Sequence, residues 1–316
     1  MGLARQICAT ISFVSLIACD PVPPSVDPPT SPRPQVREPV VQTITQPSDE
    51  SKELAIYYRR LQNDLLTQGL LRVDGGGPDT PFTDTILARN FVRIALFDEY
   101  VAAGDALRPQ ATLSRLKRWD QPIRMDVEFG QSVPRDQRAA DKNSVASYAA
   151  RLARITGLDI RQTDENPNFH VMVLNEGDRK DYAPRLRELV PGIATSSLNA
   201  IINLPRDQRC IIVAFSEGGA SFYSKAIAVI RGEHPDLLRT SCFHEELAQG
   251  LGLANDSPQA RPSIFNDDEE FGLLTTHDEF LLKILYDPRL QTGMKPDEAA
   301  PIARIIARDL LAGTPS

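Results

Sequence analysis

Histidine is scarce in this chain, with four residues among 316, and no two of them stand four positions apart. A zinc-peptidase helix needs two imidazoles at that spacing, because positions i and i+4 lie on one face of a helix. Basic residues are also outnumbered, 35 against 42 acidic ones, and they form no basic stripe. The sequence therefore argues against a helical pair of zinc-binding histidines. It also argues against a nucleic-acid partner, since phosphate binding normally requires a basic surface.

Two common catalytic motifs are missing as well. Ser216, in the stretch AFSEGGAS, lacks the Gly-x-Ser-x-Gly turn that exposes the nucleophile of many serine hydrolases. The stretch DGGGPD, residues 74–79, lacks the lysine and the following Ser or Thr of a phosphate-binding loop. Neither stretch predicts a catalytic site.

The N-terminal segment, residues 1–18, predicts a secretory signal peptide. Its apolar run follows Arg5 and is too short for a membrane span of about 20 residues. The run ends in Leu-Ile-Ala before Cys19, which resembles the lipobox of bacterial lipoproteins. We expect Cys19 to be lipidated; an ordinary secretion signal with an incidental cysteine is the alternative. The protein would then cross the inner membrane and stay lipid-anchored in the cell envelope, facing the periplasm, with Asp20 favouring the inner membrane.

Residues 19–50 are rich in proline and almost free of aromatic residues. Such a composition cannot bury a core and favours extended polyproline conformations. We therefore expect a tether that starts at Cys19 and holds the folded part away from the membrane. The helical spacing of apolar residues then predicts a helix and a Gly-rich hinge in residues 51–78.

The remaining sequence predicts an α+β fold in which a mixed β-sheet packs with helices, in residues 79–296, followed by a C-terminal helix in residues 297–316. Strict alternation in PIRMDVEFG, residues 122–130, predicts a half-buried strand. Apolar runs predict further strands at residues 169–175, 210–215 and 226–230. Helices are predicted at residues 83–100, from a cap at Asn143 or Ser144 to Gly157, and at residues 276–286 and 296–311.

Cys210 and Cys242 are the two cysteines that remain in the predicted mature protein. In an oxidising periplasm such a pair favours a disulfide. We expect a structural bridge between them rather than a reactive thiol.

The stretch TSCFHEELAQGLGLAND, residues 240–256, resembles the zinc helix of metzincin proteases with its ligands replaced. Metzincins carry His-Glu-x-x-His, then x-Leu-Gly-Leu, and a third histidine three residues after the glycine. In this comparison Glu245, Gln249 and Asn255 occupy the three histidine positions. Glu246 occupies the position of the glutamate.

The resemblance continues downstream. Gly252 would let the chain leave the helix sharply, as the glycine of metzincins does. PSIFND, residues 262–267, is similar to the segment around the methionine turn, with Phe265 in the methionine position, and residues 274–287 are similar to the final metzincin helix. Residues 83–294 as a whole resemble a bacterial family known as domain of unknown function 2927. The resemblance implies a metzincin-like fold.

The residues in the three ligand positions do not suit zinc. Zinc favours imidazole and thiolate, whereas one carboxylate and two amide oxygens, from Glu245, Gln249 and Asn255, suit a hard cation and would hold even calcium weakly. Without zinc there is no bound water with its pKa lowered to about 7, so Glu246 would have nothing special to activate. We therefore expect no cofactor, apart from a weakly bound hard cation such as calcium.

The resemblance implies a degenerate metalloprotease, and we expect it to be non-catalytic, with a binding or scaffolding role toward an envelope protein or peptide. Its cleft would be lined by Glu245, Glu246, Gln249, Asn255 and Asp256. An alternative stays open, in which Glu246 activates a water and Gln249 stabilises an oxyanion, giving a peptidase or other hydrolase without zinc.

Two neighbouring features leave further alternatives. The acidic run NDDEE, residues 266–270, offers oxygen ligands for a hard metal, but its spacing is not that of an EF-hand loop and is typical of a solvated turn. His244 lies about 100° round the helix from Glu245, and we expect it to pack rather than to bind a ligand.

Overall fold

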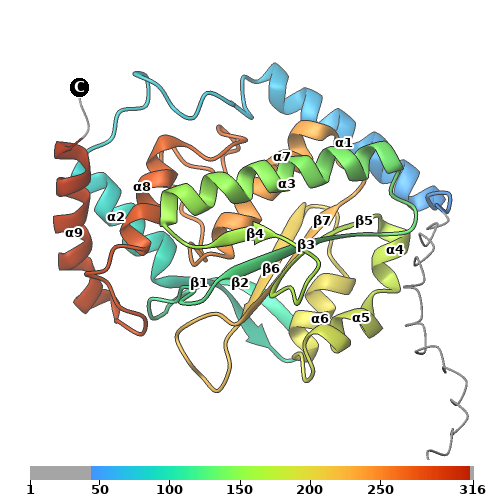
Figure 1. Ribbon diagram of the computed structural model, residues 1–316. Helices are drawn as coiled ribbons and strands as arrows, with labels where there is room; N and C mark the ends of the chain where they lie inside the picture. Colours follow the sequence, from blue (N-terminus) through green and yellow to red (C-terminus); the bar gives the residue numbers. More distant parts are fainter. Residues whose placement is uncertain (1–43, 314–316) are drawn as a thin grey trace, which may run out of the picture. The chain divides into compact units, whose positions relative to one another are not determined.

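A mixed five-stranded sheet lies at the centre of the computed structural model, which describes residues 44–313 (Figure 1). Its strand order is β4-β3-β5-β7-β6. The first four strands in this order run parallel to their neighbours, and β6 runs antiparallel to β7 at the edge. The strands are β3 (Ile123–Phe129), β4 (Ile160–Gln162), β5 (Phe169–Leu174), β6 (Cys210–Phe215) and β7 (Lys225–Arg231).

Both faces of the sheet are covered, which explains why β5 and β7 are almost continuously apolar. Successive side chains of a strand point to opposite faces. Val171 and Val173 of β5 therefore join the main core, whereas Met172 and Leu174 join a second, smaller core on the other face. The alternation in PIRMDVEFG also reflects one buried face, because Ile123, Met125 and Val127 of β3 are buried.

Helices of two groups supply these cores (Figure 1). Around the main core lie α2 (Asp84–Ala95), α3 (Arg135–Thr156), α7 (Asp236–Gln249), α8 (Thr276–Leu285) and α9 (Pro296–Ala312). The smaller core takes side chains from α5 (Ala183–Leu189) and α6 (Thr195–Ile202), and α4 (Glu176–Lys180) precedes them. Together these elements form a mixed α and β architecture, as the sequence predicted.

Helix α1 (Asp49–Thr67) packs on the domain through a small apolar cluster of its own that includes Leu54, Tyr58 and Leu238. The Tyr58 hydroxyl donates to the carbonyl of Arg206 at 2.8 Å. The side-chain oxygen of Gln62 accepts from the backbone N–H of Leu238 at 3.0 Å, in the first turn of α7. The N-terminal helix is therefore joined to the start of α7.

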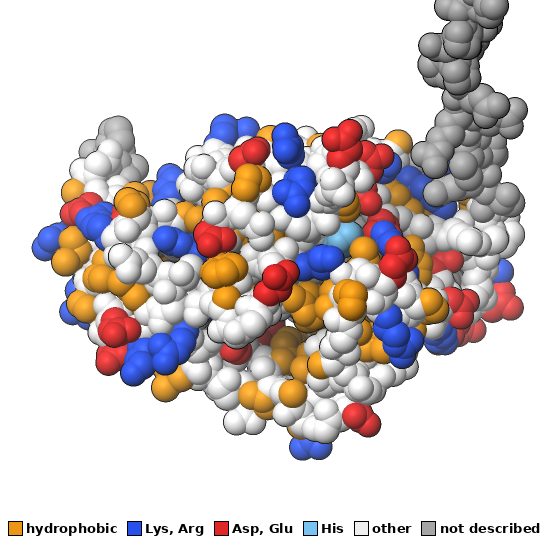
Figure 2. Space-filling model, turned by 60° about the horizontal axis from the view of Figure 1, so that its bottom comes forward, with side chains coloured by type: hydrophobic (Ala, Val, Ile, Leu, Met, Phe, Trp, Pro, Cys, Tyr) orange, Lys and Arg blue, Asp and Glu red, His pale blue; other side chains and the backbone are white. Residues whose placement is uncertain are grey.

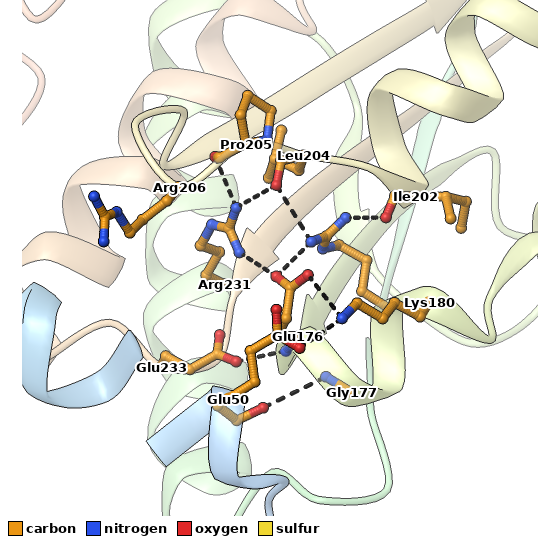
Figure 3. Close-up of polar contacts among 12 residues, drawn as sticks. Glu50, Glu176, Gly177, Lys180, Ile202, Leu204, Pro205, Arg206, Arg231 and Glu233 are labelled. Carbon is orange, nitrogen blue, oxygen red and sulfur yellow. Dashed lines mark hydrogen bonds and ion pairs between the residues drawn. The ribbon is translucent and has the colours of Figure 1, made fainter. Parts of the chain in front are cut away.

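A buried ionic cluster lies next to α1 (Figure 3). The Glu176 carboxylate accepts from Arg231 at 2.7 Å and also from Arg179. Arg231 donates further to the carbonyls of Leu204 and Pro205 at 2.7 and 2.8 Å. The buried charges are thus paired and hydrogen-bonded, which is the condition for burying them at a tolerable free-energy cost.

Two predicted helix boundaries are wrong. The helix predicted over residues 83–100 ends at Ala95, and a hairpin of β1 (Phe97–Ala103) and β2 (Ala106–Leu113) follows it. The pairing of β1 with β2 overrides a helical spacing that residues 83–100 also satisfy. Helix α3 begins at Arg135 instead of Asn143 or Ser144. The prediction placed its start too late because the first turns of α3 are largely polar and show no apolar stripe.

The disulfide between Cys210 and Cys242 is confirmed, with 6.0 Å between the two Cα atoms. It joins the edge strand β6 to helix α7. The predicted signal peptide and almost all of the tether, including Cys19, lie outside the described residues. Between residues 44 and 313, no helix has the length and apolar character needed to cross a membrane.

Candidate functional site

Helix α7 lies beside β6 and presents its C-terminal half toward a pocket. Leu247 and Phe243 bury one side of the helix in the main core. Glu245, Glu246 and Gln249 lie within about one turn of each other, so they reach the pocket on the neighbouring side. The packing of α7 on the sheet therefore fixes the backbone that carries these three side chains.

The pocket has a volume of about 150 Å³. Three segments far apart in the sequence line it: β1, the turn and strand at residues 207–212, and α7 with the loop that follows it. The face that carries the β1–β2 hairpin is hollowed, with acidic side chains visible inside the hollow (Figure 2). Its lining residues with acidic side chains are Glu99, Asp207, Glu245, Glu246 and Asp256.

Glu246 is the most deeply placed of these acids, with 4% of its surface exposed. Its Oε2 atom has no hydrogen-bond partner among the described residues. Its neighbour Gln249 donates from Nε2 to Asp256 Oδ1 at 3.2 Å. Across the pocket, Gln208 donates from Nε2 to the Tyr100 hydroxyl at 3.1 Å. A buried acceptor without a donor is costly, so the Glu246 carboxyl needs a proton or a ligand.

The acids of the pocket hold protons more tightly than isolated carboxyls do. Burial, together with the negative charges of neighbouring acids, raises the pKa of Glu99 to about 7. Burial also raises the pKa of Glu245, and raises those of Glu246 and Asp256 well above their ordinary values, with the negative charges of the other acids adding to the effect. These carboxyls therefore share a site in which they cannot all be ionised at low free-energy cost.

The guanidinium of Arg209 reaches this cluster and lowers the pKa of Glu245 and Glu246. Its own partner is Glu269, which accepts from Nη1 at 2.6 Å and from Nη2. Because Glu269 already pairs with this guanidinium, the pocket keeps a surplus of acidic groups.

The structure brings together four of the five predicted cleft residues: Glu245, Glu246, Gln249 and Asp256 line the pocket. Asn255 is 4% exposed and does not line it. Its Nδ2 atom donates to the carbonyls of Arg93 and Asp256, at 2.9 and 2.7 Å. The Asn255 amide thus fixes the loop after α7, and Asp256 is the residue of this loop that faces Gln249.

Glu99 and Tyr100 are not expected in the pocket from the sequence, because the pattern of residues 83–100 predicts a helix there. Arg209 and its neighbours carried a usable signal. They adjoin Cys210, which is expected to form a bridge with Cys242. Cys242 lies three residues before Glu245, so the bridge would place Arg209 next to α7.

His244 packs away from the pocket. Its ring stacks on Tyr148 with 3.9 Å between centroids, and its Nδ1 accepts from the backbone N–H of Leu274 at 3.0 Å. Burial lowers the pKa of His244 to about 3, so the ring is neutral. Within residues 44–313, no group of three or more His, Cys, Asp or Glu residues is arranged to hold a metal ion.

The acidic run at residues 266–270 is engaged in local contacts. The side-chain oxygen of Asn266 accepts from the backbone N–H of Asp268 at 3.3 Å, and Glu269 pairs with Arg209. Glu270 accepts from Arg261 at 2.5 Å and from Arg72 at 3.1 Å. The run thus holds the loop against two other segments.

Replacing Glu99 with glutamine should change how stability depends on pH. A carboxyl whose pKa rises from 4.5 to about 7 on folding takes up a proton when the protein folds. The contribution of this carboxyl to stability is therefore greatest below pH 4.5 and is lost as the pH rises through 7. We expect Glu99→Gln to be more stable than the parent at pH 8 by about 2 kcal/mol, allowing for partial solvent exposure. Urea unfolding at pH 4.5 and pH 8 measures this, and equal stability gains at both pH values would contradict it.

Comparison with known proteins places the chain in a family. Residues 84–305, about two thirds of the sequence, match the family model described as "Protein of unknown function (DUF2927)". No curated protein and no solved structure shows significant similarity to the chain. The matched region begins at α2 and includes every segment that lines the pocket. The chain therefore belongs to the DUF2927 family.

Proposed function

We propose that this chain is a lipid-anchored protein of the cell envelope whose metzincin-like domain binds a ligand without catalytic zinc. The observation that carries the proposal is the acidic pocket beside α7. Glu245 and Gln249, which stand in the metzincin histidine positions, both line it, together with Glu246 and Asp256. Carboxyl and amide oxygens are poor ligands for zinc compared with imidazole and thiolate. Such a pocket suits binding better than zinc-dependent hydrolysis.

Two local features support the metzincin-like part of the proposal. Gly252, three residues after the end of α7, has φ +125°, in keeping with a sharp exit of the chain from this helix. The segment PSIFND and the start of α8 meet at Asp278, whose carboxylate accepts from the Ser263 hydroxyl at 2.5 Å and from the Ile264 N–H at 3.0 Å. The two downstream motifs of the resemblance thus share one buried hydrogen-bond cluster.

Localisation rests on sequence alone. The apolar run of residues 1–18, the lipobox-like ending before Cys19 and the proline-rich residues 19–50 support export, lipidation and a tether. The ligand would then be a molecule of the periplasm, such as an envelope protein or peptide.

A second candidate function, hydrolysis without zinc, is favoured by the pKa values of the pocket. Acid–base catalysis uses carboxyls whose environments hold one protonated while another ionises. Glu99, with its pKa raised to about 7, and Glu246 offer such a pair. Gln249 donates one Nε2–H to Asp256, which leaves its second N–H for an oxyanion.

Metal content and hydrolysis together test the proposal. We expect the chain from residue 44 onward, purified without chelator, to contain substoichiometric zinc and to leave unstructured peptides uncleaved. Stoichiometric zinc would overturn the zinc-free function. Cleavage that disappears in Glu246→Gln but persists in Glu233→Gln would establish the second candidate instead. Glu233 is a matched control, because it is also a buried acid with an unpartnered Oε2 but lines a different pocket.

A further inference from the structure

We propose that the pocket beside α7 takes an organic cation, an ammonium or guanidinium group, whose hydrocarbon stem lies in the adjoining groove between the β1–β2 hairpin and α6. This inference rests on the proposed binding function and names the chemistry of the ligand. The unpartnered carboxylate oxygen of the buried Glu246 is the observation that points to a ligand.

Charge favours a cation as the occupant. Glu99, Glu245, Glu246 and Asp256 face one pocket, and the guanidinium of Arg209 that approaches them is already paired with Glu269. A bound cation would let the carboxyls ionise without mutual repulsion, and charge-assisted hydrogen bonds to a buried carboxylate are stronger than neutral ones. An anion or a neutral ligand would leave the repulsion between the carboxyls in place.

Volume favours a head group larger than one atom. A cavity of about 150 Å³ has room for about five water molecules at their liquid volume. An ammonium group with two or three waters, or a guanidinium group, fits this space. Its several N–H donors match the several carboxyl oxygens, Glu246 Oε2 among them.

The adjoining groove supplies a place for the rest of the molecule. It has a volume of about 590 Å³ and shares Tyr100, Asp207, Gln208 and Ile211 with the acidic pocket. Its other walls come from the β1–β2 hairpin and from α6 with the turn after it, and include the apolar residues Leu107, Pro109, Ala200 and Pro205. The two cavities together suit an elongated ligand with a charged end and an apolar stem, as in a lysine or arginine side chain of a peptide.

A metal ion is a weaker occupant for this site. Metal binding requires ligand atoms that converge at about 2–2.6 Å from one point. Within the described residues, no group of three or more acids is placed in this way. Hydrogen-bonding cations tolerate the longer, more varied distances between carboxyls that come from β1, α7 and the loop after it.

Binding of matched amino-acid derivatives tests the proposal. Nα-acetyl-arginine amide and Nα-acetyl-lysine amide are titrated by calorimetry at pH 7.5 into the chain from residue 44 onward, whose described part forms one compact unit. Nα-acetyl-citrulline amide, which has nearly the shape of the arginine probe without its charge, is the control ligand. We expect the cationic probes to bind at least about tenfold more tightly than the citrulline probe, the ratio that one charge-assisted hydrogen bond supplies.

Variants identify the site. We expect Glu246→Gln and Asp256→Asn each to weaken arginine-probe binding about tenfold or more, and Glu233→Gln to leave it unchanged. Equal binding of arginine and citrulline probes, insensitivity to both pocket variants, or Glu246-dependent binding of calcium in place of the probes would overturn the proposal. A protein that is free of zinc and inactive in hydrolysis but indifferent to cationic probes would refute this inference alone, and the proposed binding role would stand.

Discussion

Gly252→Ala is expected to destabilise the folded protein by about 3 kcal/mol or more, since both backbone strain and a steric clash oppose it. Gly252 has φ +125°, a conformation that residues with a side chain rarely adopt. A Cβ atom added there would lie 2.3 Å from the carbonyl oxygen of Lys117. Because this oxygen belongs to the backbone, relief requires a shift of the segment before β3 or of the loop that carries Asp256.

Gly157→Ala is the matched control for this variant. Gly157 also has a left-handed conformation, φ +74°, but a Cβ there would meet no described atom within 4 Å. We expect a loss of about 1 kcal/mol from the conformation alone. Urea unfolding followed by circular dichroism measures both variants. Equal losses for the two alanines would show that the close approach to Lys117 does not matter.

Removal of the disulfide should cost about 3–4 kcal/mol. The bridge between Cys210 and Cys242 closes a loop with a sequence separation of 32, and the loss of such a constraint from the unfolded chain accounts for this magnitude in the chain-entropy model. The double variant Cys210→Ala/Cys242→Ala should also loosen the pocket, because Cys210 is part of its wall.

Reduction provides the internal control for the disulfide. A reductant should lower the stability of the parent protein toward that of the double variant and have no effect on the double variant itself. The measurement is the free energy of unfolding in urea, with and without dithiothreitol. A parent protein equally stable in both conditions would contradict the expected role of the bridge.

Local pattern was enough to predict the elements that form the core of the domain. The alternation in β3 and the apolar runs of β5, β6 and β7 each reflect a buried face, and such faces are visible in the sequence. The short helices α4, α5 and α6 and the three-residue strand β4 were not predicted, since elements of this length show too few periods to be recognised.

The pocket was predicted in part, for a related reason. Glu245, Glu246 and Gln249 lie on one helix, so helical spacing alone brings them together. Glu99 enters through the β1–β2 hairpin, which depends on pairing between strands rather than on local spacing. Asn255 lies outside the pocket because its amide donates to backbone carbonyls, and no pattern in the sequence indicates these bonds.

Glu99, Glu245, Glu246 and Asp256 share one buried site and hold protons more tightly than ordinary carboxyls. Carboxyl-carbon NMR of protein labelled with ¹³C-glutamate and ¹³C-aspartate, titrated from pH 4 to pH 9, measures this directly. We expect a glutamate with a pKa of about 7 that is absent from the spectra of Glu99→Gln, and other acids of the cluster titrating above their ordinary range. If every glutamate and aspartate titrated at the ordinary values near 4, the pocket would not be the shared acidic site described above.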